Sequence, residues 1–140
     1  MKVLRMLHEG FIENFTSQKL KERLRSKLSS DKIYSFLRDK FADETAIWRP
    51  LIAYEIYSRM SKVVNPNVLV KASPDPEDNE LLSVAVCSGA DVVITLDRRH
   101  LLSLRDPKTK EILIEDEQGC RVFRVKVLTP AEFIEEVQRQ

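Results

Sequence analysis

Three acidic residues, Glu22, Asp78 and Asp97, occupy positions where carboxylates could share a divalent cation. Each comes soon after a predicted strand, Asp78 in the first turn of the next helix and Asp97 two residues after a strand at 91–95. In an open parallel sheet, ligands bind beyond the carboxyl ends of the strands. Converging carboxylates offer oxygen ligands, which suit Mg²⁺ or Mn²⁺, and these ions polarise a phosphodiester and activate water. The pattern favours such a metal site, although spacing alone does not specify a nuclease.

Asp78 shares a predicted helix face with apolar residues. It precedes Leu82 and Ala85 by four and seven residues, so its side chain is expected to point inward. An inward carboxylate needs compensation by helix N–H groups or by a cation. Each acid also has a structural explanation: Asp78 and Asp97 can be capping residues, and Glu22 can be a surface residue paired with a cation three residues away.

The elements that must position these acids alternate between helices and short apolar strands. Helix signals cover residues of about 1–8, 17–28, 31–41, 43–60, 75–88, 97–104 and 129–137, and strand signals cover 11–15, 63–64 with 68–70, 91–95, 112–114 and 122–128. This alternation predicts an α/β sandwich with a largely parallel sheet. Trp48, in the longest predicted helix, is expected to be a core anchor.

Two helix starts are marked with particular clarity. Asp75-Pro76 combines a capping residue with proline at the first helical position, and Gly89 supplies the stop for that helix. Thr129-Pro130-Ala131-Glu132 has the pattern of a capping box. The helix after Asp75 is apolar on most of its surface, so we expect it to be buried.

Length and composition indicate a single domain spanning residues 1–140. The 23 basic and 22 acidic residues give a net charge of +1, which excludes a highly basic nucleic-acid coat. The balance hides an asymmetry, with 13 basic and 8 acidic residues up to Lys62 and 10 and 14 after it. Two cysteines form no disulfide framework, and no apolar run has the length of a membrane span, so we expect a cytoplasmic protein with no membrane partner.

A series of motifs extends through the second half of the chain: Asp75-Pro76-Glu77-Asp78-Asn79, Gly89-Ala90-Asp91, Thr95-Leu96-Asp97, Leu101-Leu102 and Val127-Leu128-Thr129-Pro130-Ala131-Glu132-Phe133. In these motifs and their spacing, the chain resembles the second half of a PIN domain. It is most similar to the subgroup that includes toxins of toxin–antitoxin systems. Upstream, the segment from Glu9-Gly10 to Leu24 resembles the part of the family that carries a helical Glu.

The resemblance implies a PIN-like three-layer sandwich, with a mainly parallel sheet flanked by helices. It also implies a ribonuclease that depends on Mg²⁺ or Mn²⁺ and cleaves single-stranded RNA. Glu22, Asp78 and Asp97 match three of the family's acidic positions, and these residues are the predicted catalytic and metal-binding set. An antitoxin or another protein partner, and a homo-oligomer, follow from the same resemblance.

The chain departs from the family pattern at its start. PIN domains open with a strand that ends in an Asp-x-Asn motif, and this sequence has no counterpart before its first predicted helix. The site would then lack one ligand. An edge of the sheet would also be exposed, unless the sheet is rebuilt, another chain covers the edge or a natural N-terminal extension supplies the strand. A noncatalytic PIN-like module for interaction or dimerisation is therefore the alternative function.

Overall fold

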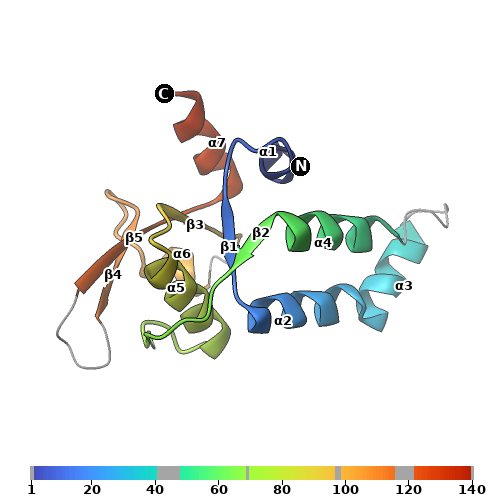
Figure 1. Cartoon of the computed structure of the whole chain (residues 1–140), viewed down its shortest axis with the longest axis horizontal. Coiled ribbons are helices and arrows are strands. Elements are labelled where there is room, and N and C mark those ends of the chain that lie inside the picture. The colour runs from blue at the N-terminus through green and yellow to red at the C-terminus, as the bar shows by residue number, and fades with distance from the viewer. Residues whose placement is uncertain (1, 41–47, 69, 97–98, 116–121, 140) are drawn as a thin grey trace. The chain divides into compact units, whose positions relative to one another are not determined.

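The structure is a computed structural model that describes residues 2–40, 48–68, 70–96, 99–115 and 122–139. The chain divides into two compact units, Met1–Val63 and Val64–Gln140, and each unit is described by itself. Figure 1 shows helices and strands in both units. The predicted α/β class is confirmed.

The first unit is mainly helical. Its only paired strands among the described residues, β1 and β2, are parallel, with Asn14 opposite Ser61 and Thr16 opposite Val63. Helix α4 packs against both α1 and α2 (Figure 1). The elements are α1 (Lys2–His8), β1 (Asn14–Thr16), α2 (Gln18–Leu28), α3 (Asp31–Lys40), α4 (Arg49–Met60) and β2 (Ser61–Val63).

Local signals explain where the helices of the first unit begin and end. The chain leaves α1 through Gly10, whose φ of 81° is accessible to glycine without strain. The Ser17 hydroxyl caps α2 by accepting a hydrogen bond from the Leu20 N–H at 3.1 Å. Pro50 lies in the first turn of α4, where its missing N–H costs no helical hydrogen bond.

The second unit has a three-stranded sheet in the order β3-β5-β4. Strand β3 is parallel to β5, whereas β4 and β5 form an antiparallel hairpin. The hairpin confirms the two strands predicted at 112–114 and 122–128. The elements are α5 (Pro76–Ser88), β3 (Val92–Ile94), α6 (Leu101–Leu104), β4 (Glu111–Glu115), β5 (Val122–Leu128) and α7 (Pro130–Gln138).

The core of the second unit lies between α5 and this sheet. Leu82 of α5, Ile114 of β4 and Val127 of β5 are completely buried, and Leu101 of α6 is 1% exposed. The prediction of a buried α5 is therefore confirmed. Gly89 ends the helix in the left-handed conformation, with φ of 70°.

Two predictions about apolar residues are wrong. Trp48 is 62% exposed and is not a core anchor. Val68 and Val70, the two described residues of this predicted strand, belong to no strand. The Val70 N–H donates instead to the Ser83 hydroxyl of α5, at 3.2 Å. Part of the helix predicted at 43–60 lies outside the described residues, and the described helix begins at Arg49.

A cluster of charged groups ties α6, β4, β5 and α7 together around Glu132. Arg105 donates to both carboxylate oxygens of Glu132, at 2.9 and 3.2 Å, and also to the Val127 carbonyl at 2.7 Å. Lys110 Nζ lies 2.8 Å from Glu132 Oε2. The carboxylate also completes the predicted capping box by accepting from the Thr129 N–H. Arg105, then Lys110 and the Thr129 N–H, hold the pKa of Glu132 well below its usual value.

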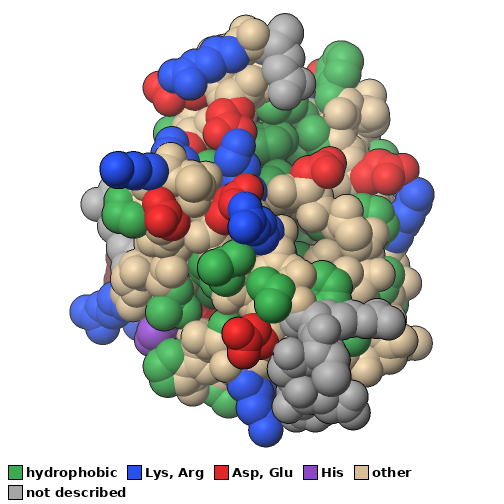
Figure 2. Space-filling model, turned by 90° about the vertical axis from the view of Figure 1, so that its left-hand side faces the viewer, with side chains coloured by type: hydrophobic (Ala, Val, Ile, Leu, Met, Phe, Trp, Pro, Cys, Tyr) green, Lys and Arg blue, Asp and Glu red, His purple; other side chains and the backbone are tan. Residues whose placement is uncertain are grey.

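Charged side chains of both signs lie on the face drawn in Figure 2. Figure 2 shows basic and acidic side chains interspersed on the face that it draws, with no field of a single sign. Within the described residues, no helix combines the length and apolar character that crossing a membrane requires.

Truncation of Ile114 tests the core. Ile114 is fully buried, whereas its neighbour Leu113 on the same strand is 63% exposed. We expect Ile114→Ala to reduce the free energy of unfolding by about 3 kcal/mol, because it removes buried methylene groups and leaves a cavity. Leu113→Ala should cost less than about 1 kcal/mol. Urea titration followed by circular dichroism measures both values, and equal losses would contradict this core.

The Glu132 cluster predicts a pH dependence of stability. The folded-state pKa lies below the unfolded-state value near 4.5, so the carboxylate stabilises the fold above that pH and loses this contribution as the pH falls below it. Glu132→Gln should cost about 1 to 3 kcal/mol at pH 7, and its difference from the wild type should shrink below pH 4.5. Glu135→Gln, which changes an exposed acid of the same helix, is the control. A difference that stays constant down to pH 3 would show that the ionised carboxylate of Glu132 is not the source of the stabilisation.

Candidate functional site

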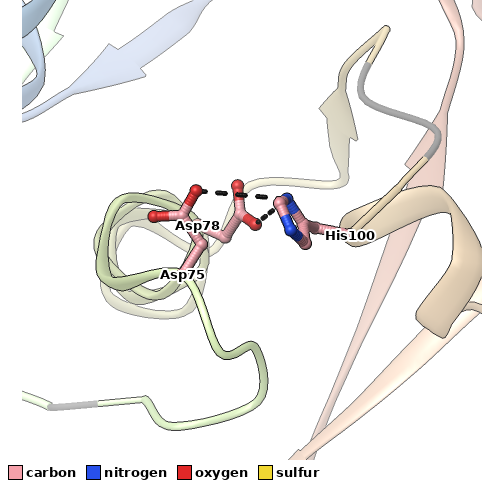
Figure 3. A group of neighbouring side chains, drawn as sticks. All are labelled: Asp75, Asp78 and His100. Atoms are coloured by element: carbon pink, nitrogen blue, oxygen red, sulfur yellow. Dashed lines mark ion pairs between the residues drawn. The ribbon is translucent and has the colours of Figure 1, made fainter.

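Asp75, Asp78 and His100 bring two carboxylates and an imidazole together (Figure 3). His100 Nδ1 lies 3.5 Å from Asp78 Oδ2 and 4.0 Å from Asp75 Oδ2. One ligand atom from each residue lies within 4.8 Å of the other two. Asp78 is 8% exposed, while the side chains of Asp75 and His100 are 36% and 38% exposed. The cluster is therefore anchored on a buried carboxylate and reachable from solvent.

The start of α5 positions both carboxylates. Asp75 is the N-cap residue, and its Oδ1 accepts a hydrogen bond from the Glu77 N–H at 2.9 Å. This bond leaves Oδ2 as the oxygen that faces His100. Asp78 follows in the first helical turn, where the positive end of the helix dipole favours a negative charge. Pro76 has the backbone angle that the first helical position needs.

The segment before α5 is held by Ser73 and Asn79. The Asn79 side-chain carbonyl accepts from the N–H groups of Ala72 and Ser73, at 3.0 and 2.8 Å, and its amide donates to the Ser73 carbonyl at 2.8 Å. The Ser73 hydroxyl in turn donates to Asp78 Oδ2 at 3.0 Å. This chain of bonds sets the orientation of the Asp78 carboxylate.

His100 reaches the cluster from the start of α6. It is the N-cap residue of this short helix, and the next residue, Leu101, is buried in the core. At the other end of the helix, Arg105 is bonded to Glu132. Core packing and an ion pair thus hold the two ends of the segment that carries the imidazole.

The donor set fits a divalent cation. Ligands about 2.1 Å from one octahedral ion are separated by roughly 3 to 4.2 Å, and the distances from His100 Nδ1 to the two carboxylate oxygens fall in this range. Carboxylates suit Mg²⁺ and Mn²⁺, whereas imidazole is a ligand of transition metals. A cation would also compensate the buried charge of Asp78.

The structure describes two of the three acids predicted from the sequence. Asp78 is buried, as its helical spacing indicates. Glu22 is exposed on α2 in the first unit, and its carboxylate accepts from Gln18 at 3.5 Å instead of pairing with a neighbouring cation. Asp97 lies outside the described residues. The assignment of Glu22 and Asp97 to the site remains a prediction.

Sequence reasoning missed Asp75 and His100. Asp75 was explained by its cap, and that explanation holds for only one of its two oxygens. His100 has no ligand at a spacing typical of a local metal motif, since its partners lie more than twenty residues earlier. Its position directly before the apolar residues of α6 was the one signal that it would be held near the core.

Comparison with known proteins points to a single family. A family model described as PIN domain matches residues 1–99. The uncharacterized protein MJ1680 of Methanocaldococcus jannaschii is 33% identical over 138 residues, which cover 99% of this chain and 79% of the relative. No solved structure matches the chain. The matched range contains the predicted acids and ends one residue before His100.

Asn79→Ala tests the support of the site. We expect it to lower the free energy of unfolding by about 1 to 3 kcal/mol, because two part-buried N–H groups lose their acceptor. Asn65→Ala, which changes an exposed asparagine of the same unit, should stay within about 0.5 kcal/mol of the wild type. Thermal and urea unfolding measure both changes, and similar values for the two variants would refute the proposed role of Asn79.

Proposed function

The chain belongs to the PIN domain family, and we propose that it is a metal-dependent endoribonuclease that cleaves phosphodiesters of single-stranded RNA. Family membership indicates a nuclease-type function. The observation that carries the finer proposal is the buried Asp78 carboxylate beside a second carboxylate and an imidazole. This donor set fits the divalent-metal dependence that is general among PIN domains.

The residues of the cluster would hold a divalent cation and limit its position. Ser73 orients one oxygen of Asp78 through a hydrogen bond, and the helix cap leaves Asp75 Oδ2 directed at the same point. A bound Mg²⁺ or Mn²⁺ supplies charge stabilisation for the scissile phosphate and lowers the pKa of a water. The family resemblance is the ground on which Asp97 and, in the first unit, Glu22 are proposed as metal-binding acids.

The first unit offers cations that suit a polyanionic substrate. Helix α2 carries five basic residues and one acidic residue. Lys19, Arg23 and Lys27 recur at intervals of four, which places them on one face of the helix. Such a row attracts phosphates in a salt-dependent way and carries no base specificity. This row supports RNA as the substrate class.

The alternative is a noncatalytic module that binds another protein, such as an antitoxin or a second copy of the chain. A hollow of about 450 Å³ in the first unit favours it, because apolar residues of α4 and Trp48, the residue before that helix, line it. Trp48 and Ile52 are 62% and 58% exposed. Exposed apolar clusters of this kind often mark protein contacts. If the chain neither cleaves RNA nor binds a divalent cation, this second function is favoured.

Substitution of Asp78 tests the enzyme. We expect weak, Mn²⁺- or Mg²⁺-dependent cleavage of single-stranded RNA that EDTA abolishes. Asp78→Asn and Asp97→Asn should each lower the rate by about 100-fold or more, because each removes a ligand charge while keeping approximate side-chain shape. Asp91→Asn, an exposed acid outside the cluster, is the control. A fluorogenic RNA assay gives the rates, and circular dichroism confirms folding.

Cleavage that survives EDTA or both substitutions would show that the activity has another origin. Loss of activity in the control as well would indicate a general effect on the fold and would argue against the assignment to Asp78 and Asp97.

A further inference from the structure

We propose that His100 is a metal ligand through Nδ1 and that it gives the site a preference for Mn²⁺ over Mg²⁺. This inference rests on the proposed function, since it concerns the same cation site. It adds a nitrogen ligand to a set that sequence reasoning had limited to carboxylates.

The direction of the imidazole carries the first step. Nδ1, and not the carbon edge of the ring, faces the two carboxylates, at 3.5 Å from Asp78 and 4.0 Å from Asp75 (Figure 3). The two acids come from the start of α5 and the histidine from the start of α6. Two separately supported segments therefore bring three ligand atoms within 4.8 Å of one another.

The support of the carboxylates carries the second step. Asp75 is held by the Glu77 N–H, and Asp78 by the Ser73 hydroxyl. The Ser73 hydroxyl and the imidazole share Asp78 Oδ2, whereas the Glu77 N–H uses the Asp75 oxygen that does not face His100. Each acid therefore has a hydrogen bond besides its contact with the imidazole. The cluster is thus preorganised for a shared cation and does not depend on a single ion pair.

The chemistry of the donors decides which cation is preferred. Mg²⁺ takes oxygen ligands in a nearly ideal octahedron and keeps several waters. An imidazole nitrogen binds first-row transition metals better than Mg²⁺, while carboxylates and water also suit Mn²⁺. Two carboxylates with one imidazole therefore favour Mn²⁺. A purely oxygen-based site would give no such advantage.

The test uses the full chain and no RNA. Mn²⁺ is titrated into the protein, and the signal of the free ion in electron paramagnetic resonance reports the bound fraction. Mg²⁺ affinity is then obtained by competition with Mn²⁺. The variant is His100→Asn, because the asparagine carbonyl places an oxygen near the position of Nδ1 and so replaces a nitrogen ligand by an oxygen ligand. His8→Asn, which changes the other histidine of the chain, controls for weak binding by surface imidazoles.

We expect His100→Asn to lower the affinity for Mn²⁺ by about tenfold while the affinity for Mg²⁺ changes less than about threefold. His8→Asn should leave both affinities as in the wild type. Thermal unfolding with and without MnCl₂ gives a second readout, because a ligand of the folded state raises the midpoint. The Mn²⁺-induced increase should be smaller in His100→Asn than in the wild type.

Two results would overturn the inference. Equal changes in the two affinities would mean that His100 acts only as a counter-ion, since loss of a competing positive charge affects both cations alike. Unchanged affinities would mean that it takes no part in binding. Because these measurements involve no RNA, the two proposals can fail separately. If the chain cleaves no RNA but His100→Asn loses the Mn²⁺ preference, the nuclease is rejected and His100 remains a ligand. If the chain cleaves RNA but His100→Asn keeps that preference, the nuclease remains and His100 is not a ligand.

Discussion

The burial of one carboxylate is the constraint on which the site depends. Asp78 is 8% exposed, and an ionised carboxylate in such surroundings is costly unless hydrogen bonds, helix N–H groups or cations compensate it. The chain supplies the Ser73 hydroxyl, the start of α5 and the His100 imidazole. The need to compensate the buried Asp78 carboxylate thus gathers groups around a position that a divalent cation can occupy.

A second interaction keeps the histidine in place from a distance. Glu132 caps α7 and accepts from Arg105, the residue that ends α6, while Leu101 anchors the beginning of α6 in the core. Since α6 has only four residues, these two anchors leave little freedom to the segment that carries His100. Glu132, which completes the capping box of α7, therefore helps to position His100 through its bond to the end of α6.

Membership of the PIN domain family and the geometry of this unit agree on the class of chemistry but differ in detail. The family resemblance emphasises acids, and the structure places a histidine beside one of them. If that histidine is a ligand, the site combines a nitrogen ligand with the carboxylates that are typical of the family. The cationic face of α2 in the first unit is the feature that supports the proposed nucleic-acid substrate.

The sequence by itself determined the features that arise from neighbouring residues. The caps at Asp75 and Thr129, the inward direction of Asp78 and the strand at 112–114 follow from local bonds, helical periodicity and a short apolar run, and the structure has all of them. Only the tertiary structure decided the pairing of His100 with Asp78 and of Arg105 with Glu132, and the loss of the strand expected around Val70. These outcomes depend on which partners the folded chain brings close together, and periodicity within a few residues carries no record of partners 13 to 27 residues away.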